Sequence, residues 1–196
     1  MATRKPNILW ICTDQQRFDT LSAVGNTHVH TPNLDRLARE GVLFENAFAQ
    51  NSVCTPSRAS FLTGRYPRTT RCRQNGQGIP ADEVLVTKMF PDAGYECGLA
   101  GNLHLNPFHP GVVGNAGERR VDDGYDVFHW HHDHWPWSAY GEGVDAQGEE
   151  REFNKLEACP HVEVGPAASA TPTAWAAAMA ADFMRQRADS NEPWLF

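Results

Sequence analysis

The sequence predicts an α/β fold in which helices sandwich a mostly parallel sheet. Segments typical of buried strands alternate along the chain with segments typical of amphipathic helices, and this order favours parallel strands joined by helical crossovers. The elements that we expect are strands over residues 7–13, 42–49, 95–100, 125–128 and 193–196, and helices starting at 31–32 and 55–56 and covering residues 84–93 and 172–187.

Apolar runs identify the first two strands. Residues 7–13 form a continuous apolar run that ends at Asp14, which is typical of a strand buried on both faces. Val42 and Phe44, followed by residues 47–49, give the second.

Capping residues delimit the first two helices. Thr31 caps the first one, Pro32 occupies its first turn and Gly41 ends it, as expected for an N-cap, an N1 proline and a C-terminal glycine. The second helix has the same signals, with a Thr-Pro pair at 55–56 and Gly64 at its end.

Residues 106–165 differ in character from the rest of the chain. They are rich in Gly, His, Trp and acidic residues, and predict a long loop-rich insertion within one domain spanning residues 1–196. The chain then ends on Pro-Trp-Leu-Phe at 193–196, which resembles the first residues of a buried strand. We therefore expect the sequence to be truncated, the N-terminal part of a larger domain.

Composition narrows the classes of partner and compartment. The 196 residues carry 17 Lys+Arg against 24 Asp+Glu, and the net charge of −7 disfavours nucleic acid as a partner. Five cysteines at wide spacings argue against a disulfide framework and favour a reducing compartment. The apolar run near the start is too short for a signal peptide or a membrane helix. We expect a cytoplasmic protein without a membrane partner.

Asp14 and Gln15 directly follow the first expected strand. The carboxyl ends of parallel strands form the ligand crevice of such sheets, and carboxylate and amide oxygens suit a hard cation such as Ca²⁺ or Mg²⁺. A solvated turn is the alternative for these two residues.

Cys54 lies just before the second expected helix, and Arg58 follows one turn inside it. Free N–H groups at a helix start, together with an arginine, favour an anion and lower the pKa of a thiol. The spacing to Arg58 is too short for the phosphate loop of a cysteine-dependent phosphatase. The alternative is a buried, inert cysteine.

Residues 54–65 read Cys-Thr-Pro-Ser-Arg-Ala-Ser-Phe-Leu-Thr-Gly-Arg. This segment resembles the complete signature of the type I sulfatase family, in which the cysteine is oxidised to formylglycine. The resemblance extends over the flanking chain to about Gly101 and returns at residues 124–128 and 193–196. It implies an alkaline phosphatase-like α/β fold, of which this chain would be the N-terminal part.

The resemblance also implies a chemistry. A formylglycine-generating enzyme would modify Cys54, which would then act as the nucleophile toward a small-molecule or carbohydrate sulfate ester. Arg58 would hold the modified residue, and His104 would contact the substrate. Asp14, Gln15 and the modified Cys54 would bind a divalent metal, with Ca²⁺ expected first and Mg²⁺ or Mn²⁺ as alternatives.

Two positions depart from the sulfatase pattern. Asn102 stands where the family has a lysine, and Gln15 replaces the second aspartate of many arylsulfatases. Both changes resemble the phosphonate monoester and phosphodiester hydrolases of the same superfamily, in which a substrate-binding asparagine matches Asn75. Besides a sulfatase, the sequence thus leaves open such a hydrolase or a non-catalytic, sulfatase-like binding protein.

Two further expectations follow. The family's second half supplies another aspartate, a His or Asn metal ligand and a second lysine, so we expect this chain alone to bind metal weakly and turn over little substrate.

Residues 129–137, rich in His and Trp, leave open a zinc site, but adjacent loop residues rarely converge tetrahedrally. We expect them instead to line the substrate pocket.

Overall fold

The computed structural model describes residues 4–106, 123–131, 139–147 and 154–196. The chain divides into two compact units, one formed by Met1–Leu9 with Gln50–Phe196 and the other by Trp10–Ala49. Every helix in the described part of the chain is too short or too polar to cross a bilayer.

The first unit is built on a small parallel sheet. Its strands β1 (Glu96–Gly101), β2 (Val127–Trp130) and β5 (Trp194–Leu195) lie in the order β2-β1-β5. Ile8 extends the sheet by one parallel bridge to Leu195, with its N–H 2.8 Å from the carbonyl oxygen of Trp194. The strands expected near residues 95–100, 125–128 and 193–196 are confirmed.

Two expected strands are not formed. Of residues 7–13 only Ile8 pairs with the sheet, and residues 42–49 contain no strand. A strand needs a neighbour for its backbone N–H and C=O groups, and an apolar run does not supply one. These expectations were wrong because they rested on apolar content alone.

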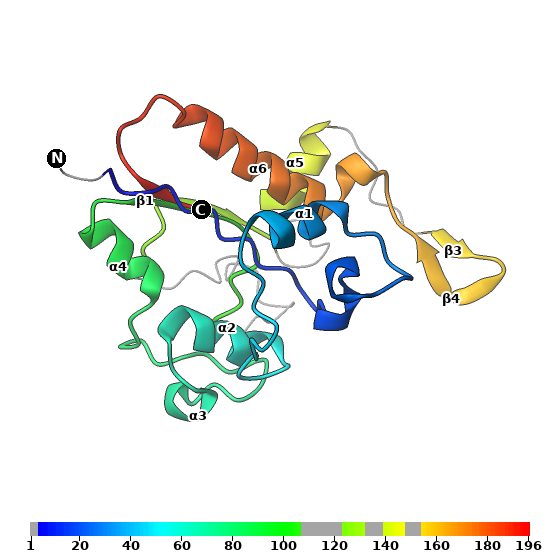
Figure 1. The fold of residues 1–196 in the computed structure, drawn as a ribbon, viewed down its shortest axis with the longest axis horizontal. Helices are drawn as coiled ribbons and strands as arrows, with labels where there is room; N and C mark the ends of the chain where they lie inside the picture. The colour runs from blue at the N-terminus through cyan, green and yellow to red at the C-terminus, as the bar shows by residue number, and fades with distance from the viewer. Residues whose placement is uncertain (1–3, 107–122, 132–138, 148–153) are drawn as a thin grey trace. The chain divides into compact units, whose positions relative to one another are not determined.

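Helices cover both faces of the sheet. The helix α4 (Val86–Asp92) and the helix α6 (Pro172–Gln186) both pack on β1, and Figure 1 shows them on opposite sides of it. Thr171 caps α6, because its Oγ1 accepts a hydrogen bond from the N–H of Ala174 at 3.2 Å. The predicted helix-sheet-helix sandwich is confirmed in this unit.

The core of the first unit lies between β1, α4 and the helix α2 (Cys54–Thr63), which is followed by the short α3 (Pro67–Thr70). On the α6 side, Phe183 packs against Phe196 with ring centroids 4.6 Å apart. A Cβ at Gly98 would lie 2.6 Å from the Phe196 ring, so only glycine fits beneath these rings. The buried members of the main cluster are Ala59, Leu62, Cys72, Ile79, Leu85, Cys97, Leu103, Leu105, Tyr125 and Leu195.

The region expected to be loop-rich, residues 106–165, contains more structure than predicted. Besides β2 it holds the helix α5 (Ala139–Gln147) and an antiparallel hairpin of β3 (Asn154–Leu156) and β4 (Cys159–Val164). Residues 107–122, 132–138 and 148–153 lie outside the described part. The hairpin was missed because β3 has only three residues and β4 has only two aliphatic side chains, Val162 and Val164.

The second unit contains two 3₁₀ turns, Phe18–Thr20 and Ser22–Val24, and the helix α1 (Pro32–Glu40). Thr31 and Gly41 flank α1 as predicted. No residue of this unit is buried. Polar contacts connect its parts: the hydroxyls of Ser22 and Thr31 donate hydrogen bonds to the two carboxylate oxygens of Asp35 at 2.6 and 2.9 Å.

Candidate active site

Cys54 is the first residue of α2 and is partly buried. The preceding Val53 has extended backbone, so the chain turns into the helix at the cysteine itself, one residue earlier than expected. The next residues do not offer the free N–H groups that we expected. The N–H of Thr55 is bound by Asn75, Pro56 has none, and the N–H of Ser57 donates to the carbonyl of Val53 at 3.1 Å.

Asn75 caps this helix start from a distant part of the chain. Its Oδ1 accepts the hydrogen bond from the N–H of Thr55 at 3.0 Å, across 20 residues of sequence. Gln77 holds the loop, because its side-chain Oε1 accepts a hydrogen bond from the N–H of Arg73 at 2.8 Å. Asn75, predicted as a substrate-binding residue, therefore lies beside the candidate nucleophile, where it satisfies one of the donors at the helix start.

Arg58 connects α2 to the carboxyl end of β1. Its guanidinium donates a hydrogen bond to the backbone carbonyl of Asn102, the residue that directly follows the strand. The Oδ1 of Asn102 is buried and has no hydrogen-bond partner among the described residues. The arginine of the signature and the asparagine that departs from the family pattern are thus in direct contact.

His104 leaves the same strand end two residues later. It is 9% exposed and lies between two core residues, Leu103 and Leu105. Its φ of 52° is in the left-handed region, which a residue with a Cβ adopts at a cost of about 1–3 kcal/mol. The packing of its neighbours therefore holds His104 at the carboxyl edge of the sheet.

Asp14 and Gln15 belong to the second unit, and both are exposed. Gln15 also has a left-handed backbone, with a φ of 53°. Within the described residues, no three His, Cys, Asp or Glu side chains gather into a metal-binding group. Metal binding by Asp14, Gln15 and the modified Cys54 stays a prediction.

The thiols differ in environment. All five cysteines are free thiols in this structure. Burial raises the pKa of Cys97 to about 11, helped by the nearby carboxylates of Asp126 and Glu96, and burial also raises the pKa of Cys72. These two thiols are protonated and shielded at neutral pH, whereas Cys54 is partly accessible at a helix start.

The described histidines of the 129–137 segment pack in a core. The ring of His129 lies 6.4 Å and that of His131 5.8 Å from Trp175, in edge-on contacts. Trp175 and Tyr140 are 6% and 0% exposed, so neither offers a ring face to a substrate. Residues 132–138 lie outside the described part, and with them the rest of the expected pocket lining.

A parallel sheet covered by helices, with polar residues at the carboxyl end of its central strand, is the layout of an α/β enzyme. The chain belongs to the sulfatase family, whose family model, Sulfatase, matches residues 6–196.

Curated relatives agree with this assignment. An ulvan-active sulfatase of Formosa agariphila is 45% identical over 102 residues, which are 52% of this chain and 20% of that protein. An N-acetylglucosamine-6-O-sulfatase of Bacteroides thetaiotaomicron is 35% identical over 103 residues, 53% of this chain and 18% of that protein. The chain thus spans about a fifth of the length of each.

A solved structure is similar over nearly the whole chain. The phosphonate monoester hydrolase of Agrobacterium radiobacter matches 97% of this chain and 40% of its own, with a TM-score of 0.71 and 29% identity. The expected alkaline phosphatase-like α/β architecture, present here in part, is therefore confirmed.

Proposed function

We propose that the protein carrying this chain hydrolyses sulfate esters, with a formylglycine made from Cys54 as its nucleophile. The observation that carries the proposal is the position of the signature: Cys54 begins α2, and Arg58 binds the chain where it leaves β1. Membership of the sulfatase family supports the same chemistry.

The residues have distinct roles in this proposal. Arg58 would hold the modified Cys54 through its guanidinium, which also donates a hydrogen bond to the carbonyl of Asn102. Asn75 fixes the helix start that presents the nucleophile. We assign to His104 a contact with the substrate and a proton transfer to the leaving oxygen, because an imidazole exchanges protons near neutral pH.

The donor set on the second unit fits a divalent cation. Asp14 offers a carboxylate and Gln15 an amide oxygen, and both side chains are exposed. Hard oxygen donors of this kind favour Ca²⁺, with Mg²⁺ or Mn²⁺ next. When bound, the cation would supply positive charge that stabilises the nucleophilic oxygen and the sulfate group.

The substrate class follows from the relatives. One is named for an N-acetylglucosamine 6-O-sulfate and another for ulvan. We propose a carbohydrate or small-molecule sulfate ester as the substrate, and a formylglycine-generating enzyme as the partner that modifies Cys54.

A phosphonate monoester hydrolase is the second candidate. It is favoured by the similar solved structure of such an enzyme, which covers 97% of this chain, and by Gln15 and Asn102 at the two departing positions. The ratio of kcat/KM on 4-nitrophenyl sulfate to that on 4-nitrophenyl phenylphosphonate, measured on the intact protein, discriminates the two. A higher value for the sulfate supports our proposal.

Peptide mass spectrometry of the segment containing Cys54 tests the nucleophile directly. We expect conversion of the thiol to the aldehyde when the intact protein is co-produced with a formylglycine-generating enzyme. Cys54→Ala should abolish hydrolysis, whereas Cys12→Ala, which removes an exposed thiol of the other unit, should leave the chemical step intact. An unmodified Cys54 in an inactive protein would contradict the proposal and favour a non-catalytic binding protein.

A further inference from the structure

Residues 65–73 concentrate positive charge on a chain whose net charge is −7. Four arginines, at positions 65, 68, 71 and 73, fall within nine residues, and all four are exposed. Arg65 forms an ion pair with Glu83 at 3.3 Å. In the described part of the chain, the guanidinium groups of Arg68, Arg71 and Arg73 have no acidic partner, so they are available to an external anion.

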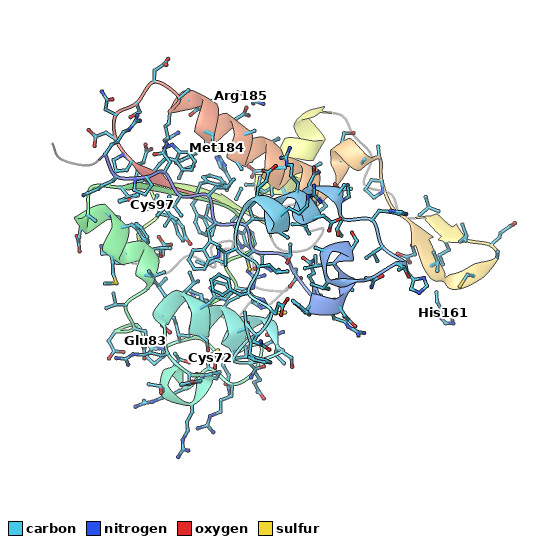
Figure 2. All side chains as sticks on the ribbon, in the orientation of Figure 1. Cys72, Glu83, Cys97, His161, Met184 and Arg185 are labelled. Atoms are coloured by element: carbon cyan, nitrogen blue, oxygen red, sulfur yellow. The ribbon has the colours of Figure 1, made fainter. Side chains whose placement is uncertain are left out.

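Two buried side chains anchor the backbone of this segment in the core. Thr70 and Cys72 are fully buried, whereas Arg71 and Arg73, which alternate with them, are exposed. Figure 2 labels Cys72 close to α2 and α3, and long side chains extend outward from this end of the unit. The small side chains thus fix the segment to the core, and the guanidinium groups face solvent.

Arg71 has an unfavourable backbone for an arginine. It is the C-cap of α3, with a φ of 61°, a conformation that favours glycine. An observed outlier of this kind supports a functional hypothesis, since glycine would satisfy the turn and the arginine contributes only its side chain.

The arginine-bearing segment joins the candidate active site along the chain at both of its ends. One residue separates Arg73 from Asn75, which binds the N–H of Thr55 beside Cys54. Arg65 and Arg68 follow the far end of α2, and its ten residues span about 15 Å. A single sulfated sugar at Cys54 is shorter than this helix, whereas an extended chain with several sulfates is long enough to span it.

We infer that residues 65–73, the arginine segment, dock a polysulfated carbohydrate chain while one of its sulfates occupies the site at Cys54. The inference rests on the proposed sulfatase function and names its substrate class. Arginine suits this partner because its planar fork of N–H donors matches the oxygens of a sulfate group. Single-stranded DNA presents a similar charge, and the test therefore includes it.

Binding of the intact protein to dextran sulfate tests the inference, with uncharged dextran and single-stranded DNA as comparison ligands. We expect Arg68→Gln/Arg71→Gln/Arg73→Gln to weaken dextran sulfate binding about tenfold or more at low salt, and to reduce the salt slope by roughly 1 per arginine. The matched control Arg36→Gln/Arg39→Gln/Arg185→Gln removes the same charge from exposed positions elsewhere and should retain most of the affinity.

The single variant Arg71→Gly separates a loss of dextran sulfate binding from a loss of folding. Glycine suits a φ of 61°, so this variant should be at least as stable as the parent protein and still bind dextran sulfate more weakly. For each variant, kcat on 4-nitrophenyl sulfate should stay unchanged.

Several results would overturn the inference. These are equal losses in the arginine-segment variant and its control, unchanged binding in Arg71→Gly, or DNA binding of equal strength with the same dependence on these arginines. If the parent protein hydrolysed no sulfate ester at all, the proposed function would be rejected instead. The binding comparison would still test the role of the arginine segment.

Discussion

The two units of the chain are stabilised in different ways. In the first unit, Leu85 and Cys97 are fully buried in an apolar cluster. In the second unit nothing is buried, and large apolar side chains such as Val42 and Phe44 are 78% and 73% exposed. Its order comes instead from hydrogen bonds around Asp35.

Residues predicted for the site occur in both units. Cys54, Arg58, Asn75 and His104 belong to the packed unit, so tertiary packing fixes the position of the proposed nucleophile, Cys54. The oxygen donors of Asp14 and Gln15 belong to the unit without a core. We therefore expect mutations in the two units to act by different physical routes.

Truncating a core leucine gives the largest expected effect on stability. Leu85→Ala should lower the free energy of unfolding by about 2–5 kcal/mol, because it leaves a cavity in the apolar cluster. Leu37→Ala on α1, where the side chain is 55% exposed, should change it by no more than about 0.5 kcal/mol. Chemical denaturation of the intact protein measures both, and equal losses would contradict the distinction between the units.

Removing the cap on α2 should have an intermediate effect. Asn75→Ala leaves the N–H of Thr55 unsatisfied and should cost about 1 kcal/mol of stability, with a larger fall in kcat than in substrate affinity. Asn75→Asp keeps an oxygen acceptor and should restore most of both.

Asn33→Ala, an exposed change on α1, is the matched control for the cap and should be neutral. If Asn75→Asp behaved like Asn75→Ala, the positioning role of the Oδ1 atom would be wrong, and direct substrate contact by the amide would explain the loss.

A smaller effect is expected where β1 meets the end of α6. Arg187 donates hydrogen bonds to both carboxylate oxygens of Glu96 and lies 3.6 Å above the ring of Phe183. The hydrogen bonds with Arg187 hold the pKa of Glu96 below its ordinary value of 4.5. The unfolded chain therefore binds this proton more readily, and the stabilisation is present above pH 4.5 and lost as the pH falls through the lowered value.

Glu96→Gln measures that stabilisation. The variant should be less stable than the parent by about 1 kcal/mol or less near pH 7, and the difference should shrink below about pH 4.5. Glu192→Gln, at an exposed position whose carboxylate has no partner among the described residues, should show no such pH dependence. A difference that persisted at pH 3 would assign the effect of Glu96 to packing rather than to charge.

The sequence predicted those elements whose signals are local. Capping residues placed α1 correctly, since the flanking threonine, the proline in the first turn and the closing glycine act on their own helix. The segments 7–13 and 42–49 were assigned wrongly as strands, because pairing depends on distant partners. A strand at β5 was predicted correctly, and β1 supplies its partner.

The site was predictable as a set of residues but not as a set of contacts. The signature and its flanks indicated Cys54, Arg58 and Asn75. The hydrogen bonds from Thr55 to Asn75 and from Arg58 to the carbonyl of Asn102 cross 20 and 44 residues of sequence. They depend on how α2 packs against β1, and no local pattern encodes that packing.

The smallest expected effect lies in the second unit. The hydroxyl of Ser22, and after it the hydroxyl of Thr31 and the N–H of Ala23, stabilise the charged form of Asp35 and lower the pKa of its carboxyl group. Asp35→Ala removes these acceptors and should accelerate amide exchange at Ala23, whose N–H lies 2.9 Å from Oδ1 of Asp35. Protonation of Asp35 as the pH falls through its lowered pKa should loosen the same contacts.

We expect the faster amide exchange in Asp35→Ala to be confined to the second unit. Because Asp35 is not part of a buried core, its loss should leave amide exchange at Ile79, in the core of the first unit, unchanged. Glu40→Gln at the exposed end of α1 should alter neither amide. Faster exchange at both Ala23 and Ile79 in Asp35→Ala would show that the polar network of one unit supports the core of the other.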